Sequence, residues 1–298
     1  MAQTEPLIHW PQPFIEYAGF IAAYLASGAV GFRYAVLRNL GRGSAAPIKE
    51  ERSLLESVAG RAAALGLSGA VLGVVLLASK LPELAARRHV PVARFVIGSA
   101  PVAVQFALAL VAVAGFAMAL RRRSPGWPLA AIGVIAGALR SVVFAQWSRL
   151  VNPVHVLAGG MWLGTLFVLV FVGLAAVLRS PLAPERRATL AAEMVNGFSP
   201  LALVSAAVLA SFGLLTAWMH LKTLSALWTT PYGYALIVKL CIVLAVVALG
   251  AWNWRRQRPR MGTKDGVLHL RRKAWAELAV AALVLAVTAV LVSLPSPG

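Results

Sequence analysis

Residues 154–178 read VHVLAGGMWLGTLFVLVFVGLAAVL, a run of 25 residues that contains no Asp, Glu, Lys or Arg. A helix needs about 20 mostly apolar residues to cross the hydrocarbon core of a bilayer, so this run predicts a membrane-spanning helix. Seven more segments qualify in the same way: Pro13–Val36, Ala62–Ser79, Ala100–Leu120, Trp127–Gln146, Pro200–Met219, Tyr232–Trp254 and Ala274–Leu294. The sequence therefore predicts an all-α, polytopic transmembrane helical bundle with about eight spans.

The composition of the whole chain agrees with a membrane protein. Of its 298 residues, 60% are hydrophobic and only 13% are charged, and the mean hydropathy is +0.78. The net charge of +18 is carried by short basic clusters between apolar runs. This pattern is typical of loops at a lipid surface, so we expect the lipid bilayer as a partner and no nucleic acid. Cys241 is the only cysteine, which excludes an internal disulfide.

The distribution of Lys and Arg predicts the orientation of the spans. With the N-terminus outside, the inner loops are 37–61, 121–126, 179–199 and 255–273, and they hold nineteen basic residues against six outside. The positive-inside rule then places both termini on the outer, periplasmic side. The first residues lack a basic region and a small-residue cleavage site, so we expect the first hydrophobic segment to remain as a membrane anchor.

Two pairs of glycines have the spacing that favours close helix packing in lipid. Gly69 and Gly73 lie four residues apart in one predicted span, and Gly133 and Gly137 do so in another. Helix association in a bilayer depends on van der Waals contact, which small residues allow. We interpret these glycines as packing residues rather than as a phosphate-binding loop.

Four of the five histidines fall on the predicted outer side. His9 precedes the first span, His89 lies in the second outer loop, His155 begins the fifth span and His220 ends the sixth, whereas His269 lies inside. Imidazole is a common metal ligand, and its clustering on one face predicts an outward-facing site.

Met161 and Met219 share the outer ends of these helices with His155 and His220. Imidazole and thioether together suit copper better than hard cations, so the candidate metal ligands are His155, His220, Met219, Met161 and His9. His155 and Met161 are six residues apart and lie well round a helix from each other, so a site would have to be built between helices. Taken singly, each histidine also fits an interfacial residue with a solvated tip, and each methionine fits ordinary packing.

Ionisable residues inside predicted spans are costly in lipid and usually face a partner or a cavity. They are Glu16, Arg33, Arg140, Lys239 and Glu277. By depth, Glu16 is expected to pair with Arg140 or Lys239, and Glu277 with Arg33 or an inner-loop arginine. Two interpretations remain open for the outer residues, namely buried ion pairs that fix helix packing or the polar lining of a cation route.

Three stretches resemble the copper resistance protein D (CopD) family of bacterial inner-membrane proteins. They are the histidine-led helix VHVLAGGMWLGTLFVL from Val154, the helix pair from Phe198 to Trp254 with Thr-Pro-Tyr-Gly at 230–233, and the last helix from Leu270. The resemblance covers the chain from about residue 154 to the end. It divides the chain into an N-terminal four-helix membrane region, 1–150, and a CopD-like four-helix membrane region, 151–298, within one membrane domain.

The resemblance implies copper homeostasis at the cytoplasmic (inner) membrane, commonly import from the periplasm beside a CopC-like copper-binding partner. By motif it points to the residues His155, Trp162, Tyr232, Lys239, Glu277 and His220. Copper, as Cu⁺ or Cu²⁺, would be the cargo or ligand. The sequence departs from the family pattern after Thr216, where Ala217 stands in place of the usual glycine and Gly213 comes earlier.

Two other functions are compatible with the same residues. His155 and His220 could be the axial ligands of a b-type haem in an electron-transfer protein. Alternatively, the chain could deliver copper to a respiratory oxidase as an assembly factor. No hydrolytic triad or nucleotide-binding loop is present, so we do not expect an enzyme.

Overall fold

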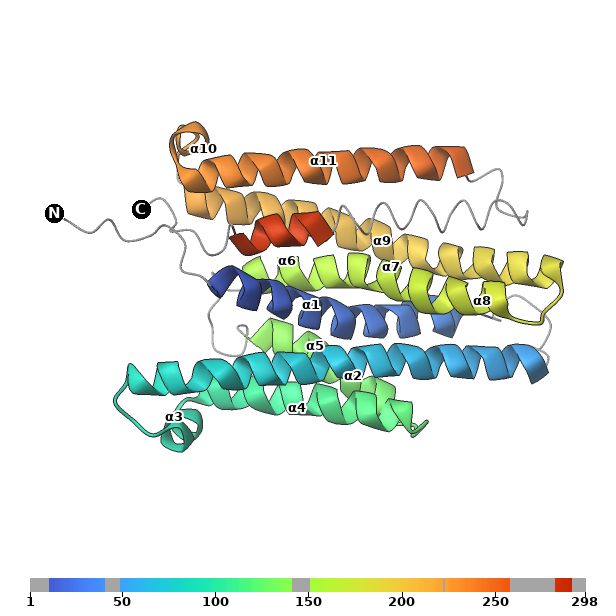
Figure 1. The fold of residues 1–298 in the computed structure, drawn as a ribbon, viewed down its shortest axis with the longest axis horizontal. Helices are drawn as coiled ribbons and strands as arrows, with labels where there is room; N and C mark the ends of the chain where they lie inside the picture. The colour runs from blue at the N-terminus through green and yellow to red at the C-terminus, as the bar shows by residue number, and fades with distance from the viewer. Residues whose placement is uncertain (1–10, 41–48, 141–150, 222, 258–281, 291–298) are drawn as a thin grey trace.

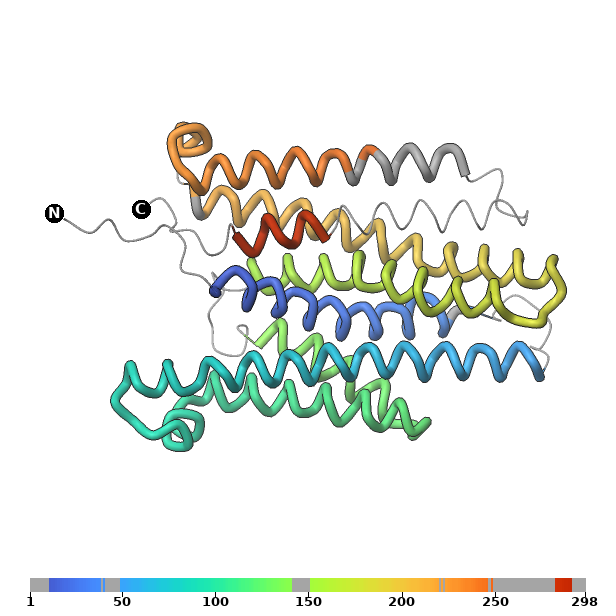
Figure 2. Tube along the Cα trace, viewed as in Figure 1, coloured from blue at the N-terminus to red at the C-terminus, as the bar shows by residue number. Residues whose placement is uncertain are grey.

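The structure is a computed structural model, and it describes residues 11–40, 49–140, 151–221, 223–257 and 282–290. The described chain is helical, and its long helices run along one common direction (Figures 1 and 2). This confirms the predicted all-α membrane bundle. The number of spans and the side of each terminus stay predictions.

The N-terminal half contains five α-helices and a short π-helical and 3₁₀ extension of the first. They are α1 (Gln12–Gly31), η1 (Phe32–Val36), η2 (Leu37–Asn39), α2 (Lys49–Ala86), α3 (Val92–Gly98), α4 (Ala100–Leu120) and α5 (Gly126–Leu139). Helix α1 packs on α2, α2 packs on α4, and α4 packs on α5.

The fifth predicted span is one continuous helical run with two π-helical stretches. It comprises α6 (Val151–Gly159), η5 (Gly160–Gly164), α7 (Thr165–Val168), η6 (Leu169–Leu174) and α8 (Ala175–Arg179). It is followed by α9 (Pro184–Leu221), α10 (Ala226–Thr229) and α11 (Pro231–Gln257), and residues 282–290 are also helical. Helix α1 contacts α2 in the N-terminal half and contacts this run at η5, so it links the two halves of the chain (Figure 1). Within the second half, α6 packs on α9.

Within the described residues, five helices are long and apolar enough to cross a membrane: Gln12–Val36, Lys49–Ala86, Ala100–Leu120, Val151–Arg179 and Pro184–Met219. Gly126–Leu139 and Pro231–Ala245 are shorter apolar helices at the fourth and seventh predicted spans. Most of the eighth predicted span lies outside the described residues.

Two of the predicted inner loops are partly helical. Helix α2 already begins at Lys49, inside the loop expected at 37–61, and α9 begins at Pro184, inside the loop expected at 179–199. Hydropathy identifies the part of a helix that lies in lipid, whereas charged residues such as Glu and Arg continue a helix readily in water. The second predicted span, Ala62–Ser79, lies within a helix of 38 residues.

The described core has four clusters, and α1 with its η1 extension contributes to the two largest. One contains Phe32, Val58, Leu174 and Met194 from η1, α2, η6 and α9. The other contains Val30, Ala112, Phe116 and Ala130 from α1, α4 and α5. Because α1 is held from both sides, it is the fixed element against which the helix carrying His155 is placed.

Glycines allow the closest of these contacts. A Cβ atom added at Gly28 of α1 would overlap the backbone of Gly164 in η5, and one added at Gly164 would overlap the backbone of Tyr24. Each of the two predicted glycine pairs contains one packing glycine. Gly69 lies against the backbone of α1 and Gly133 against that of α4, whereas Gly73 faces open space and Gly137 makes only ordinary contact.

Candidate functional site

His155 lies in the second turn of α6, and its half-buried imidazole faces α9. Its Nδ1 atom is 3.0 Å from the backbone carbonyl oxygen of Leu209. A carbonyl oxygen only accepts hydrogen bonds, so Nδ1 carries the proton and donates it. The ring is therefore held by a helix that lies 54 residues further along the chain.

Gly213 lies one turn beyond Leu209 on the same face of α9. A Cβ atom at this position would come within 2.9 Å of Cε1 of His155 and 3.3 Å of its Nδ1. The imidazole therefore fits against α9 only because residue 213 has no side chain.

Lys239 of α11 brings a positive charge to this side of the bundle. It lies in the third turn of α11, which begins at Pro231. Within the described parts of the chain, Lys239 forms no ion pair and no hydrogen bond.

The hydroxyl of Tyr24 lies one turn deeper than His155. A Cβ atom at Gly159, four residues after His155 on α6, would overlap this hydroxyl and would lie 3.3 Å from a methyl group of Leu209. Ser27 and Thr165 follow along the same interface, and both are buried. Ser27 donates to the carbonyl of Ala23 at 2.5 Å, and Thr165 to that of Gly28 at 3.4 Å. These two hydroxyls are occupied by backbone groups and serve the packing of the helices.

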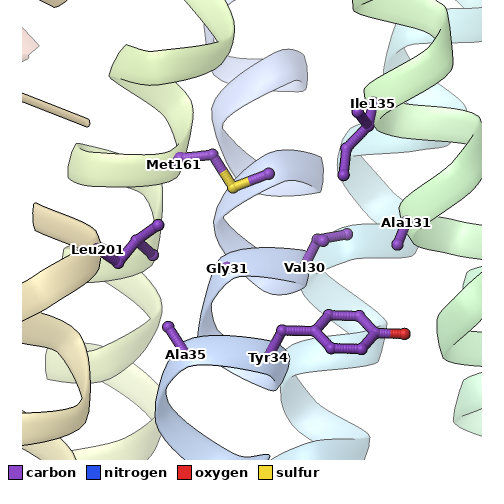
Figure 3. A pocket seen from close by; sticks show the side chains of 8 residues that line it. All are labelled: Val30, Gly31, Tyr34, Ala35, Ala131, Ile135, Met161 and Leu201. Atoms are coloured by element: carbon purple, nitrogen blue, oxygen red, sulfur yellow. The ribbon is translucent and has the colours of Figure 1, made fainter. Parts of the chain in front are cut away.

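Met161 lies in different surroundings from His155. It is in η5 and lines an apolar pocket of about 300 Å³ together with residues of α1, η1, α5 and α9: Val30, Gly31, Tyr34, Ala35, Ala131, Ile135 and Leu201. Its thioether extends towards α1 and Ile135 (Figure 3). His155 instead contacts α9, so the two side chains do not share one set of neighbours.

Trp162 follows Met161 in the same π-helical stretch. Its half-buried ring packs against the cluster that contains Phe32 and Met194. In the described part of the structure its indole N–H has no hydrogen-bond partner. π-Helical turns are rare and are often found at functional sites.

The other predicted metal ligands are less well placed or lie outside the described residues. Met219 of α9 is 42% exposed. The backbone of His220 belongs to α9, where position 220 falls on the face of Leu209 and Gly213, about two turns further on. The side chain of His220 lies outside the described part of the structure, as do all of His9 and Glu277. Among the side chains that are described, no three of His, Cys, Asp and Glu come together as a metal site.

The partner of Glu16 differs from the predicted ones. Glu16 pairs with Lys80 of α2 at 3.1 Å and accepts a hydrogen bond from Gln12 at 2.8 Å, so the expected pairing with Arg140 or Lys239 is wrong. The reason is that α1 packs along α2 at this end. Arg140 donates to the carbonyl of Gly137 at 2.8 Å.

Arg33 and Tyr232 both make packing contacts with neighbouring side chains. The guanidinium group of Arg33 lies 5.8 Å from the ring centroid of Trp127, which is a cation–π contact. Tyr232 is buried with Leu221, Ala226 and Leu236 where α10 meets α11.

Sequence reasoning missed Tyr24, Leu209 and Gly213 as neighbours of His155. Leu209 contributes a backbone atom, which leaves no trace in residue type. Gly213 was noticed only as a departure from a family pattern. Glycine in the middle of an apolar helix is a signal of close approach, and it could have indicated a bulky neighbour.

Residues 192–291 match the family described as Copper resistance protein D, which confirms the resemblance for this part of the chain. The chain is also similar to a protein of Bacillus subtilis (strain 168) described as Copper transport protein CutJ, with 33% identity over 148 residues. The aligned region is 50% of this chain and 25% of that relative, so the chain spans about a quarter of the relative's length. No solved structure matches the chain significantly.

Proposed function

We propose that this chain, whose residues 192–291 match the Copper resistance protein D family, takes part in copper transport and copper homeostasis across the cytoplasmic (inner) membrane of a bacterium. The likeness to a relative described as a copper transport protein supports a copper-related function and a transporter rather than an enzyme. The five long apolar helices support a place in the lipid bilayer.

The entry point in this proposal is an outward-facing His/Met site with His155 as its first ligand. The observation that carries it is the setting of the imidazole. Nδ1 is engaged by the carbonyl of Leu209, and within the described residues Nε2 has no hydrogen-bond partner. A histidine held at one nitrogen and open at the other is the usual arrangement of a metal ligand.

The other proposed ligands are imidazole and thioether groups, two of which belong to the end of α9. Position 220 lies on the same face of α9 as Gly213, so His220 is the proposed second imidazole, and Met219 and His9 are the further proposed ligands. Met161 lies about 9 Å deeper along the helix axis than His155, given a rise of ~1.5 Å per residue. Because its thioether lines a separate apolar pocket, we assign it to a second position that copper reaches after entry.

A CopC-like periplasmic protein is the proposed copper donor. Imidazole and thioether are exchangeable ligands for copper, so a cargo ion can pass between such sites without being trapped.

Copper uptake by cells tests the proposal with a matched pair of variants. His155→Asn keeps a donor near the Leu209 carbonyl but removes Nε2, and His89→Asn removes an exposed histidine between α2 and α3. We expect His155→Asn to lower cell-associated copper to the level of cells without the protein, and His89→Asn to leave it unchanged. Copper is measured by mass spectrometry and normalised to the protein inserted in membranes.

Equal copper in all strains would contradict transport. Unchanged total copper with loss of copper from a respiratory oxidase would favour the assembly function instead. A Soret band in the purified protein that is lost in His155→Asn would favour haem ligation.

A further inference from the structure

We propose that Gly213 and the backbone carbonyl of Leu209 position His155 so that it presents Nε2, and not Nδ1, to copper. The inference rests on the proposed function for the identity of the ion. The positioning itself follows from the packing of α6 on α9.

The Leu209 carbonyl selects the tautomer. A neutral imidazole has one N–H donor and one lone-pair acceptor, and only the lone pair binds a metal ion. Because Nδ1 lies 3.0 Å from an oxygen that can only accept, the proton resides on Nδ1 and the lone pair on Nε2. A ligand imidazole whose other N–H is bound to a carbonyl is fixed in orientation and becomes more basic.

Gly213 makes this hydrogen bond possible. The edge of the ring formed by Nδ1 and Cε1 lies on residue 213, whereas Nε2 is further away, at 3.9 Å from the position of a Cβ atom. Any side chain at 213 would come within 2.9 Å of Cε1, closer than real Cβ atoms approach carbon, so the ring would have to move away from α9. That movement lengthens the hydrogen bond between Nδ1 and the Leu209 carbonyl. The proton is then no longer held on Nδ1 and can reside on Nε2 instead.

Leu209 and Gly213 are one turn apart on α9, so both residues act on the same edge of the His155 ring. Substitution of groups that orient a metal-bound histidine typically costs about ten- to a hundredfold in metal affinity. We expect a loss of this size from Gly213→Ala, without loss of the ligand itself.

The first test needs no copper. The protein is labelled with ¹⁵N-histidine, and the resonances of His155 are identified by their absence in His155→Asn. We expect the metal-free wild type to show a protonated Nδ1 and an unprotonated Nε2. We expect Gly213→Ala to show a mixture of tautomers or the reverse one. A protonated Nε2 in the wild type, or an unchanged tautomer in Gly213→Ala, would overturn the inference.

The second test measures the affinity for Cu⁺ by competition with a chromogenic Cu⁺ chelator. Gly73→Ala is the matched control, because a Cβ atom there has nothing within 4 Å. We expect Gly213→Ala to weaken Cu⁺ binding about ten- to a hundredfold, Gly73→Ala to have no effect, and His155→Asn to abolish binding at this site. Equal affinities of Gly213→Ala and the wild type would overturn the inference.

The two tests distinguish failure of the inference about His155 positioning from failure of the proposed function. If His155→Asn binds Cu⁺ as tightly as the wild type, the proposed copper site is wrong, whatever the tautomer. If His155→Asn loses Cu⁺ but the wild-type tautomer is the reverse one, only the positioning by Leu209 and Gly213 is wrong. The wild-type spectrum decides this point even if Gly213→Ala fails to fold.

Discussion

Arg186 of α9 binds both carboxylate oxygens of Glu51 of α2, with Nη2–Oε1 at 2.6 Å and Nε–Oε2 at 2.9 Å. The same guanidinium group reaches Glu193 at 3.4 Å. The Glu51 side chain is only 5% exposed. This bidentate pair joins the first turns of two helices that lie 135 residues apart in the sequence.

Removal of the charge at Glu51 is expected to destabilise the bundle. Glu51→Gln leaves Arg186 without its bidentate partner, and breaking a buried pair costs about 3–5 kcal/mol. Because Arg186 is partly exposed, we expect a loss at or below the lower end of that range. Glu56→Gln is the control, since Glu56 pairs with Arg122 on the exposed surface, where pairs contribute at most about 1 kcal/mol. Denaturant unfolding in micelles gives both values, and equal losses would contradict the assignment.

Substitution of Gly164 is expected to disrupt the contact between α1 and η5. In Gly164→Ala the new Cβ atom meets the backbone of Tyr24, which cannot rotate away. Overpacking of this kind costs about 1–3 kcal/mol or more. Gly19→Ala in α1 is the control, because its Cβ atom meets nothing within 4 Å. Alanine there is expected to be neutral or to stabilise the helix by up to ~1 kcal/mol. The measurement is the midpoint of thermal unfolding, and a Gly164→Ala midpoint equal to that of Gly19→Ala would refute the close contact.

Removal of the charge of Lys239 is expected to strengthen copper binding at His155. The resemblance places Lys239 among the same motif residues as His155, so in the proposed copper site Lys239→Met removes a repulsion that doubles when the charge of the ion doubles. If Cu⁺ affinity rises about tenfold, Cu²⁺ affinity should therefore rise about a hundredfold. Lys239→Arg keeps the charge and should leave both affinities near the wild-type values. Competition titrations with chelators for each ion give the two ratios, and equal gains for both ions would argue against an electrostatic cause.

Replacement of Met161 tests the second copper position. Met161→Leu keeps nearly the same volume, so we expect a stability change below about 1.5 kcal/mol. Loss of the thioether should slow copper movement while leaving the Cu⁺ affinity of the His155 site unchanged. Met118→Leu in α4 is the control for the loss of one methionine. Copper uptake into vesicles that contain the purified variants gives the rates. A rate for Met161→Leu equal to that for Met118→Leu would leave Met161 as a packing residue only.

The membrane fold was predictable because the cost of burying charge in lipid depends on composition over about 20 residues, which can be read locally. Ala100–Leu120 was predicted with the bounds that α4 has, and the predicted Pro13–Val36 differs by one residue from the described Gln12–Val36. Helices α2 and α9 extend beyond their predicted spans, because helix formation in water obeys different preferences from insertion into lipid.

The ion-pair partner of Glu16 could not be predicted from the residues near it in the sequence. Its depth was correct, but which cation it meets depends on which helix lies beside α1, and the structure places Lys80 of α2 there. The resemblance found His155 and Lys239 by motif, but no pattern related them to each other. Which residues face each other depends on the packing of whole helices, such as α6 on α9, and no single segment specifies it.

The sequence by itself determined the helical membrane architecture, the entry of His155 into the bundle at a helix start and the resemblance that points to copper. Each of these depends on residue type and spacing along one segment. Only the tertiary structure decided which nitrogen of His155 carries the proton, because the Leu209 carbonyl and the space at Gly213 belong to another helix. The Leu209 carbonyl oxygen and the absent side chain of Gly213 have a chemical role only because the His155 imidazole packs against them.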